Sequence, residues 1–537
     1  MSAINEPAMA QNPVVDLEGQ TADITTAKDE DISDASVSVH TKLGSGAPSP
    51  KAAEKQLPIT NLDGERDPAF LVTWDGPDDP ENPMNWSRVS RWYHVWLGTI
   101  LSILTSIASS SPTGIAPNME KTFGFSSEVA TVLISVYLIG FTFGPMFWSP
   151  ASEVYGRRWI SIITVILFSI FQVACALAKN TASIIIFRLI SGAIGIAPLA
   201  NAPAIVSDVT QAHERATGMS IFMLSPLVGP SIGPVISGFI HNSGTDWRWV
   251  FWVLSMAGAF LSVVTIFTFH ETYAPTVLVH KAARKRKETG DDRWYAALEA
   301  KHVPLAQTAQ AIFVKPWEIL VREPILIAIH TYIAFQYALL YLNFQSYPVV
   351  FIFEKHYSIG VGSLTFLGIL VGGVIAIGAV IFVFGPKYMK LVKSYAPNPA
   401  PPESRLGLTK IGSVLFTVSL FIFAWTSYPG LSWVGPTVAG GVFAFSIACT
   451  FISLTAYIVD VYLQVTASAL ATQVVTRSLA AAGLPLVARQ MYETLTPRWA
   501  SSLLGFVSLV LLPTPWLLER YGPYLRSKSR YVPNKRV

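Results

Sequence analysis

Charged residues are scarce in this chain of 537 residues. They make up 13% of it and hydrophobic residues 51%, with a mean hydropathy of +0.44. Soluble domains carry roughly 25% charged residues, so the composition excludes an ordinary soluble protein. The sequence therefore predicts an integral membrane protein.

Several motifs that carry chemistry are also missing. The two cysteines, Cys175 and Cys449, lie far apart inside apolar segments, which predicts neither a disulfide framework nor a metal site. The chain has no Gly-x-x-x-x-Gly-Lys-Ser/Thr loop, no His-Glu-x-x-His helix and no Gly-x-Ser-x-Gly elbow. These absences exclude a P-loop ATPase and argue against a membrane enzyme, so we expect no cofactor and no bound metal. Basic residues are not interleaved with aromatic ones, so we expect no nucleic-acid partner.

Apolar runs long enough to cross a bilayer occur twelve times. A hydrocarbon core of about 30 Å needs about 20 apolar residues per helix. The runs lie at about 92–112, 129–148, 159–178, 183–206, 219–240 and 247–268, and then at about 325–347, 361–384, 408–427, 431–458, 466–490 and 499–518. The sequence thus predicts an all-α fold of twelve transmembrane helices in two pseudo-symmetric six-helix bundles, 92–268 and 325–518.

The three other segments are predicted to lie in the cytosol. Residues 1–91 hold an acidic disordered tail and an interfacial lead-in, because the first 90 residues contain sixteen acids and only six bases. Residues 269–324 form a basic linker, which we expect to be solvated and to touch anionic lipid, and residues 519–537 form a basic tail. With both termini in the cytosol, inner loops from Arg88 onward hold 25 Lys and Arg and outer loops six, as the positive-inside rule requires.

Ionisable residues within the runs are candidates for function, because buried charge is costly in a bilayer. Arg188 begins the fourth run and Arg477 lies in the eleventh. A structural arginine that binds neighbouring carbonyls is the alternative for both. Asp208 and Asp460 close the fourth and tenth runs, where they either hold a loop in place or carry protons. We find no acid in the middle of a run.

Polar side chains recur every three or four residues on several runs. This pattern predicts a partly aqueous central cavity, and interhelical hydrogen bonds in a static bundle are the alternative. The candidates for binding a substrate there are Ser102, Ser106, Gln336, Tyr341, Asn343, Gln345, Tyr457 and Gln473.

The fifth run combines prolines with small residues between positions 229 and 238. In a membrane helix this composition permits close helix approach and a kink. A simple packing face and a moving hinge are both compatible with it. The residues concerned are Gly229, Pro230, Gly233, Pro234 and Gly238.

A short charged turn, Ser149 to Arg158, joins the second and third runs. It resembles the signature of loop 2–3 in the major facilitator superfamily. Arg188-x-x-x-Gly192 resembles that family's span 4 motif, and Gly229 to Gly238 is similar to its span 5 antiporter signature. Together with Asp79 to Trp86, these likenesses cover about 74–530 and point to the fungal twelve-span drug:proton antiporters.

The resemblance implies the major facilitator fold and gives roles to the motifs. Glu153, Gly156, Arg157 and Arg158 would act as a conformational latch, and residues 229–238 as the antiporter hinge. Arg188, Asp208, Arg477 and Asp460 are the candidates for proton coupling. One departure is Gln345, which stands where relatives often have an acid, so the residue that binds the proton is open.

The function expected from this resemblance is proton-coupled efflux of a small, partly apolar compound, such as a drug, an antifungal or a fungal secondary metabolite. A polyamine exporter of the same family and a non-transporting nutrient sensor on the same fold are the alternatives. The expected partners are the substrate, protons and the lipid bilayer. We expect a monomer in the plasma membrane, with the vacuolar membrane as the alternative.

Overall fold

The structure is a computed structural model that describes residues 67–300, 310, 314–395, 400–462, 465–529 and 531. Most of the predicted disordered tail, residues 1–66, and the end of the chain, 532–537, lie outside these described residues. Within them the protein is all α-helical apart from a single β-bridge between Leu71 and Tyr295.

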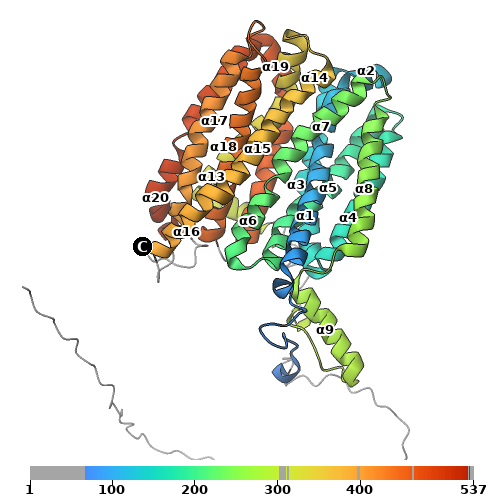
Figure 1. Ribbon diagram of the computed structural model, residues 1–537, viewed down its shortest axis with the longest axis vertical. Coiled ribbons are helices and arrows are strands. Elements are labelled where there is room, and N and C mark those ends of the chain that lie inside the picture. The colour runs from blue at the N-terminus through green and yellow to red at the C-terminus, as the bar shows by residue number, and fades with distance from the viewer. Residues whose placement is uncertain are drawn as a thin grey trace, which may run out of the picture. The chain divides into compact units, whose positions relative to one another are not determined.

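The first half of the chain forms six spans (Figure 1). The first span is built from α1 (Arg88–Ser110), η3 (Ser111–Ile115) and α2 (Ala116–Phe123), and the next three are α3 (Ser127–Val154), α4 (Arg157–Ala176) and α5 (Thr181–Val209). The fifth combines α6 (Ala212–Phe222) with α7 (Ser225–Asn242), and the sixth is α8 (Arg248–Thr268).

The second half repeats this arrangement. The first span is α13 (Pro324–Tyr347) with η4 (Pro348–Glu354), and the second runs through α14 (Ile359–Ser363), η5 (Leu364–Phe366), α15 (Leu367–Ala379), η6 (Val380–Phe384) and α16 (Gly385–Ser394). The third combines η7 (Pro402–Arg405) with α17 (Leu406–Thr426), and the fourth is α18 (Val434–Val461). The last two spans are formed together by α19 (Thr466–Leu511) and α20 (Thr514–Lys528). The helix α20 continues to Lys528, so much of the segment predicted as a tail is helical.

The last apolar helical stretch, Ser468–Lys528, contains two spans and not one. It has 61 residues, and at 1.5 Å per residue it would extend about 90 Å, about three times the hydrocarbon thickness. The helix breaks at Thr496, whose φ of 62° and ψ of 156° are not helical. Pro497 follows and disfavours a helical conformation for the residue before it. Eleven candidate stretches in the described residues therefore give twelve spans, as predicted.

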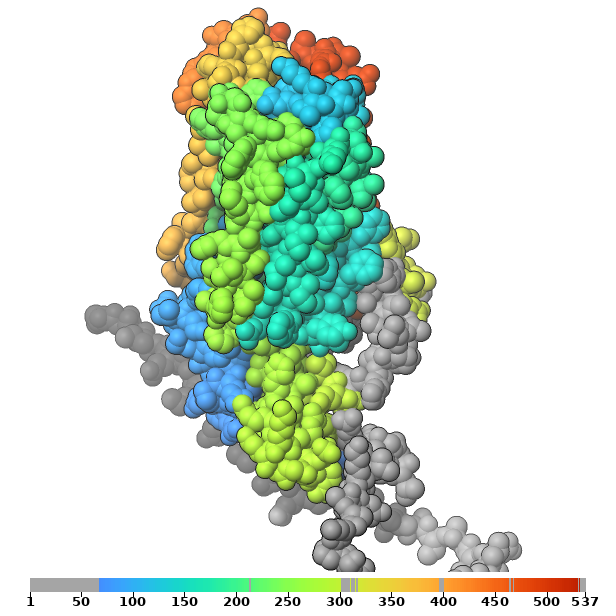
Figure 2. All heavy atoms as spheres, turned by 90° about the vertical axis from the view of Figure 1, so that its right-hand side faces the viewer, coloured from blue at the N-terminus to red at the C-terminus, as the bar shows by residue number. Residues whose placement is uncertain are grey.

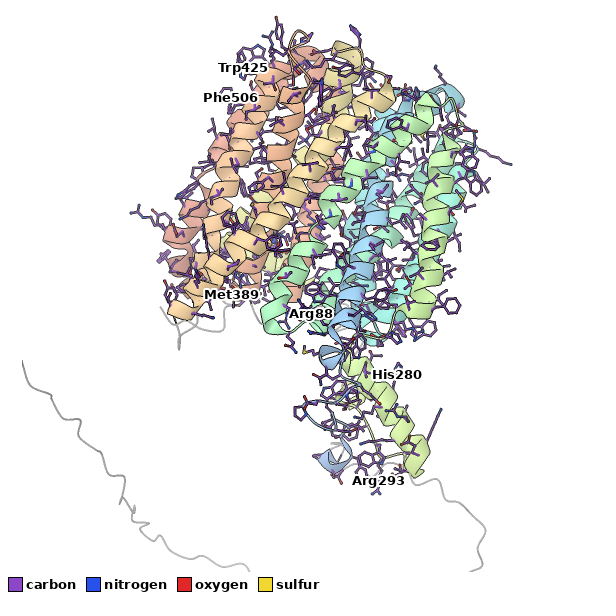
Figure 3. All side chains as sticks on the ribbon, viewed as in Figure 1. Arg88, His280, Arg293, Met389, Trp425 and Phe506 are labelled. Carbon is purple, nitrogen blue, oxygen red and sulfur yellow. The ribbon has the colours of Figure 1, made fainter. Side chains whose placement is uncertain are left out.

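The two halves meet along two pairs of spans. α3 packs against α19, and α7 packs against α14 and α15. We call the end of the bundle at which α1 begins and α20 ends the terminal face (Figure 1). On the outside, Trp425 of α17 and Phe506 of α19 project away from the helices and are about half exposed (Figure 3). Large apolar side chains on an outer surface are suited to lipid contact.

The segment between the two halves is more structured than a solvated linker. It contains α9 (Ala274–Thr289), α10 (Ala297–Ala300) and α12 (Lys315–Arg322). The lead-in is the described segment before α1, residues 67–87. Its Val72 packs with Ala282 and Ala296 in a small hydrophobic cluster. α9 and the lead-in lie side by side below the spans (Figure 2).

Candidate functional site

Arg188 of α5 is completely buried, and each of its three side-chain nitrogens donates a hydrogen bond. Its Nη1 donates to the carbonyl of Ala108 at 2.7 Å, its Nη2 to that of Ser109 at 3.1 Å and its Nε to that of Leu133 at 3.1 Å. The guanidinium also lies 4.3 Å from the centre of the Tyr137 ring. Carbonyl dipoles and an aromatic face therefore hold this charge, as in the structural alternative raised by the sequence, and its role in coupling stays a prediction.

Arg477 of α19 is buried in a different way. The residue is 8% exposed, and its Nε has no hydrogen-bond partner within the described part of the chain. The guanidinium lies 5.0 Å from the centre of the Tyr337 ring and 5.6 Å from that of Phe451. Gln473, one turn earlier, donates to Thr455 at 3.2 Å and not to a group beside Arg477. Among the described residues no acid forms an ion pair with Arg477.

A pair of tyrosines connects the two arginines across the bundles. The hydroxyl of Tyr341 shares a hydrogen bond of 2.9 Å with that of Ser109, whose carbonyl accepts from Arg188. The rings of Tyr341 and Tyr337 are 5.2 Å apart in an edge-to-face arrangement, and Tyr337 faces Arg477. The predicted candidates Arg188, Tyr341 and Arg477 therefore belong to one cluster.

A narrow cavity of about 10 Å³, with room for about one water molecule, lies between the two halves next to this cluster. Part of its wall comes from the α6–α7 segment and part from α13 and α18. The lining residues are Met223, Pro226, Leu227, Tyr337, Ile447, Ala448 and Phe451. Tyr337 and Phe451, the two rings that flank Arg477, thus form part of the cavity wall.

The other predicted cavity residues are dispersed. Asn343 lines a separate cavity of about 20 Å³ inside the second bundle, and none of the lining residues is charged. Gln336 is buried and contacts Thr450 at 3.5 Å. Tyr457 lies towards the terminal face, with its hydroxyl 3.4 Å from Glu403.

The remaining three predicted cavity residues are Ser102, Ser106 and Gln345. Ser102 donates to the carbonyl of Gly98 within α1, at 2.8 Å. Ser106 is buried against Gly229, and its hydroxyl has no described partner. Gln345 is partly buried near the end of α13.

The predicted turn 149–158 is mostly helical, because α3 continues to Val154 and α4 begins at Arg157. Glu271, which follows α8, holds the junction of these two helices at the terminal face. The Glu271 carboxylate accepts from the backbone N–H of Arg157 at 2.9 Å and from that of Arg158 at 3.1 Å, the first two residues of α4. Gly156 has a φ of 89°, and a Cβ there would collide with the same carboxylate. Glu153 is exposed and has no partner in the described structure. The acid that contacts the start of α4 is therefore Glu271, and the role of Glu153 in a conformational latch stays a prediction.

Asp208 and Asp460 occupy equivalent positions in the two halves. Asp208 of α5 forms an ion pair with Arg157 at 3.4 Å, and Arg157 also lies over the ring of Tyr273. Asp460 of α18 forms an ion pair with Arg405. Each acid thus connects the end of a span to an arginine at the start of the preceding span. Both interactions fit the interpretation that these acids hold a loop in place.

The glycines of α7 bring that helix against its neighbours. A Cβ at Gly233 would lie 2.7 Å from the carbonyl of Ile107, and one at Gly238 would lie 2.5 Å from the hydroxyl of Ser363. Pro230 and Pro234 lie inside the helix, and the carbonyl of Pro230 accepts from Ser110 at 2.8 Å. α7 therefore packs closely on α1 in its own half and on α14 in the other half.

Part of the basic run of α9 is paired with acids of the lead-in. Lys281 is 3% exposed and lies 2.7 Å from carboxylate oxygens of both Asp75 and Asp79. Its hydrogen bond lowers the pKa of Asp79 to about 2. Arg284 pairs with Glu81 in the same way. The predicted contact of this run with anionic lipid thus competes with internal ion pairs.

Comparisons with known proteins agree with this architecture. The family model of the Major Facilitator Superfamily matches residues 98–485. A solved structure of the proton:xylose symporter XylE aligns with a TM-score of 0.57 at 16% identity, covering 81% of this chain and 96% of that one. At that identity the likeness concerns the fold alone.

Relatives from fungi are similar over most of their length. The efflux pump FUBT of Fusarium oxysporum is 36% identical over 85% of this chain and 77% of its own. The multidrug transporter mdrA of Aspergillus fumigatus is 37% identical over 87% and 76%. The citrinin biosynthesis cluster transporter mrr1 of Monascus ruber is 35% identical over 86% and 93%.

Proposed function

We infer that this chain, which belongs to the major facilitator superfamily, exports a small, partly apolar compound in exchange for protons. It is a multi-pass membrane transporter and not an enzyme. The finer assignments, namely export, proton coupling and the kind of substrate, are our proposal.

The observation that carries the proposal is the place of the narrow cavity, between the α6–α7 segment of one half and α13 and α18 of the other. Transporters of this kind bind substrate near the bilayer midplane between their repeats and expose it alternately to the two sides. The lining is mainly apolar and aromatic, which suits a partly apolar compound. The export direction is supported by relatives that are named efflux pumps or multidrug transporters.

Coupling to protons needs a group that can gain and lose one. Arginine stays charged, so Arg188 and Arg477 can act only by attracting or repelling other charges. Asp208 and Asp460 are carboxylates, the usual proton relays of transporters, and each pairs with an arginine at the start of a neighbouring span. We propose that protonation of these acids weakens the two ion pairs and frees the helix ends to move.

The central charges disfavour the polyamine alternative. A polycation would require carboxylates in the cavity, whereas the described residues around Tyr337 and Tyr341 include two arginines and no acid. A non-transporting sensor has no feature in the described structure that favours it. We propose a monomer in the plasma membrane with both termini in the cytosol, in agreement with the distribution of Lys and Arg.

The test is an accumulation assay in a yeast strain that lacks its own drug pumps. Cells that express the chain should accumulate less of some compounds in a panel of antifungals and fungal metabolites. A protonophore should restore accumulation, because it collapses the gradient that drives exchange. Efflux that continues unchanged with the protonophore would refute proton antiport, and unchanged accumulation across the panel would refute export of such compounds.

A further inference from the structure

We propose that Arg477, with Tyr337 and Phe451, forms an anion-binding subsite for the carboxylate of an aromatic acid. The inference rests on the proposed function, because it names the chemical class of compound that the central cavity accepts.

The first argument is the contrast between the two buried arginines. Each of the three nitrogens of Arg188 donates to a backbone carbonyl of the protein. Arg477 has a buried Nε without a partner and no acid in an ion pair with it among the described residues. A cation inside a membrane span is normally paired or faces a cavity, because leaving it unpaired is costly. Arg477 therefore has no counter-charge among the described residues, which is typical of a cation that faces a cavity.

The second argument is the cavity itself. Tyr337 and Phe451 lie within 5.0 and 5.6 Å of the guanidinium, and both rings also line the narrow cavity between the halves. When the two halves move apart in the transport cycle and open this cavity, an aromatic ligand would contact those rings, and an acidic group on the ligand would be close to the guanidinium. The planar guanidinium binds carboxylates through two parallel hydrogen bonds.

The third argument concerns which charge the site can accept. Arg188 and Arg477 both lie near the pair formed by Tyr337 and Tyr341, so the local field is positive. In a medium of low dielectric constant such a field strongly favours an anion over a neutral compound and excludes a cation. Met223, Pro226 and Leu227 supply the apolar opposite wall.

The experiment measures binding of two matched probes, 1-naphthoate and 1-naphthamide, to the full-length protein in lipid nanodiscs at about pH 7, where a carboxylic acid is ionised. The wild type should bind naphthoate more tightly than naphthamide by about tenfold or more, since one charged hydrogen-bonded contact has at least that effect. Arg477→Gln should reduce naphthoate binding to the level of the amide and leave amide binding unchanged.

Two further variants complete the design. Arg477→Lys retains the charge without the planar fork, so it should retain part of the preference for naphthoate. Arg489→Gln is the matched control, because Arg489 lies on the same helix in an exposed ion pair with Glu493. This variant should prefer naphthoate over naphthamide as strongly as the wild type does. If Arg477→Gln does not fold, the comparison of the two probes on the wild type and on Arg477→Lys still decides the question.

The proposal is overturned if the wild type shows no saturable binding of naphthoate, if it binds the two probes equally, or if Arg477→Gln retains the preference. Failure of the proposed function gives a different result. A preference for naphthoate that depends on Arg477, without protonophore-sensitive efflux of any compound, would keep the subsite and reject the exporter. Efflux of neutral compounds alone, with equal binding of the two probes, would keep the exporter and reject the subsite.

Discussion

Glu271→Gln is the substitution that tests most directly how the junction of α3 and α4 is held. The two carboxylate oxygens of Glu271 accept from the first two backbone N–H groups of α4, at 2.9 and 3.1 Å. A glutamine keeps one of these acceptors and replaces the other with an amide NH₂, which cannot accept. Glu153→Gln is the matched control, because Glu153 lies nearby at the end of α3, is exposed and has no described partner.

The expected magnitude follows from the bonds that are lost. A hydrogen bond to a charged group contributes about 1.5–3 kcal/mol, and a negative charge at a helix N-terminus contributes about 0.3–1 kcal/mol. Glu271→Gln should therefore lower the free energy of local opening at the start of α4 by about 2–4 kcal/mol. The same change at Glu153 should stay within about 0.5 kcal/mol, as for most surface substitutions.

Amide hydrogen exchange of the full-length protein in nanodiscs measures this opening directly. The segment that contains Arg157 and Arg158 should exchange faster in Glu271→Gln and unchanged in Glu153→Gln. Transport turnover should change while the range of substrates stays the same, because the junction lies away from the cavity. Equal exchange in the two variants, or a larger effect at Glu153, would refute the role assigned to Glu271.

Three other perturbations have defined outcomes. Arg188→Ala should abolish proton-driven efflux while the protein stays in the membrane, because three buried carbonyls lose their donor; normal efflux from vesicles of this variant would contradict the role of Arg188 in coupling. Gly233→Ala combined with Pro234→Leu should slow transport, because the new Cβ would lie 2.7 Å from a carbonyl of α1, while Gly378→Ala, with open space around it, should transport at the normal rate. Finally, the ion pair of Asp79 with Lys281 should stabilise the lead-in fully above about pH 4, because the pKa of Asp79 is lowered to about 2 from 3.8, and this contribution should be lost as the pH falls through about 2. Hydrogen exchange of residues 67–86 at neutral pH should therefore become faster in Asp79→Asn. An unchanged rate would show that the pair does not hold the lead-in.

Much of the fold follows from local properties of the sequence. The twelve apolar runs predict the spans because a bilayer selects helices by length and hydropathy alone. Even the break between the last two spans has a local cause, since Pro497 disfavours a helical Thr496. The structure of the linker does not follow from its own sequence, because a basic run by itself indicates a solvated segment. The acids that pair with it belong to the lead-in, about 200 residues away in the chain.

The candidate site was predicted in part. Arg188, Tyr341 and Arg477 were identified from the sequence, and they belong to one cluster in the structure. Tyr457 was grouped with them by its spacing on α18, but it lies beside Glu403 instead. Helical spacing shows which residues share a face of one helix, and it does not show how far along the helix a cavity extends.

The sequence by itself determined the twelve spans, the residues that are costly to bury and the glycines that allow close packing, because each depends on neighbours within a few turns. Only the tertiary structure decided how the charges are paired. It placed Glu271 and not Glu153 against the start of α4, across 114 residues of chain. It also bonded Arg188 to three carbonyls while leaving Arg477 between two aromatic rings. Ion pairs and hydrogen bonds form over a few ångströms, so they depend on which helices pack together, and that information is distributed over the whole chain.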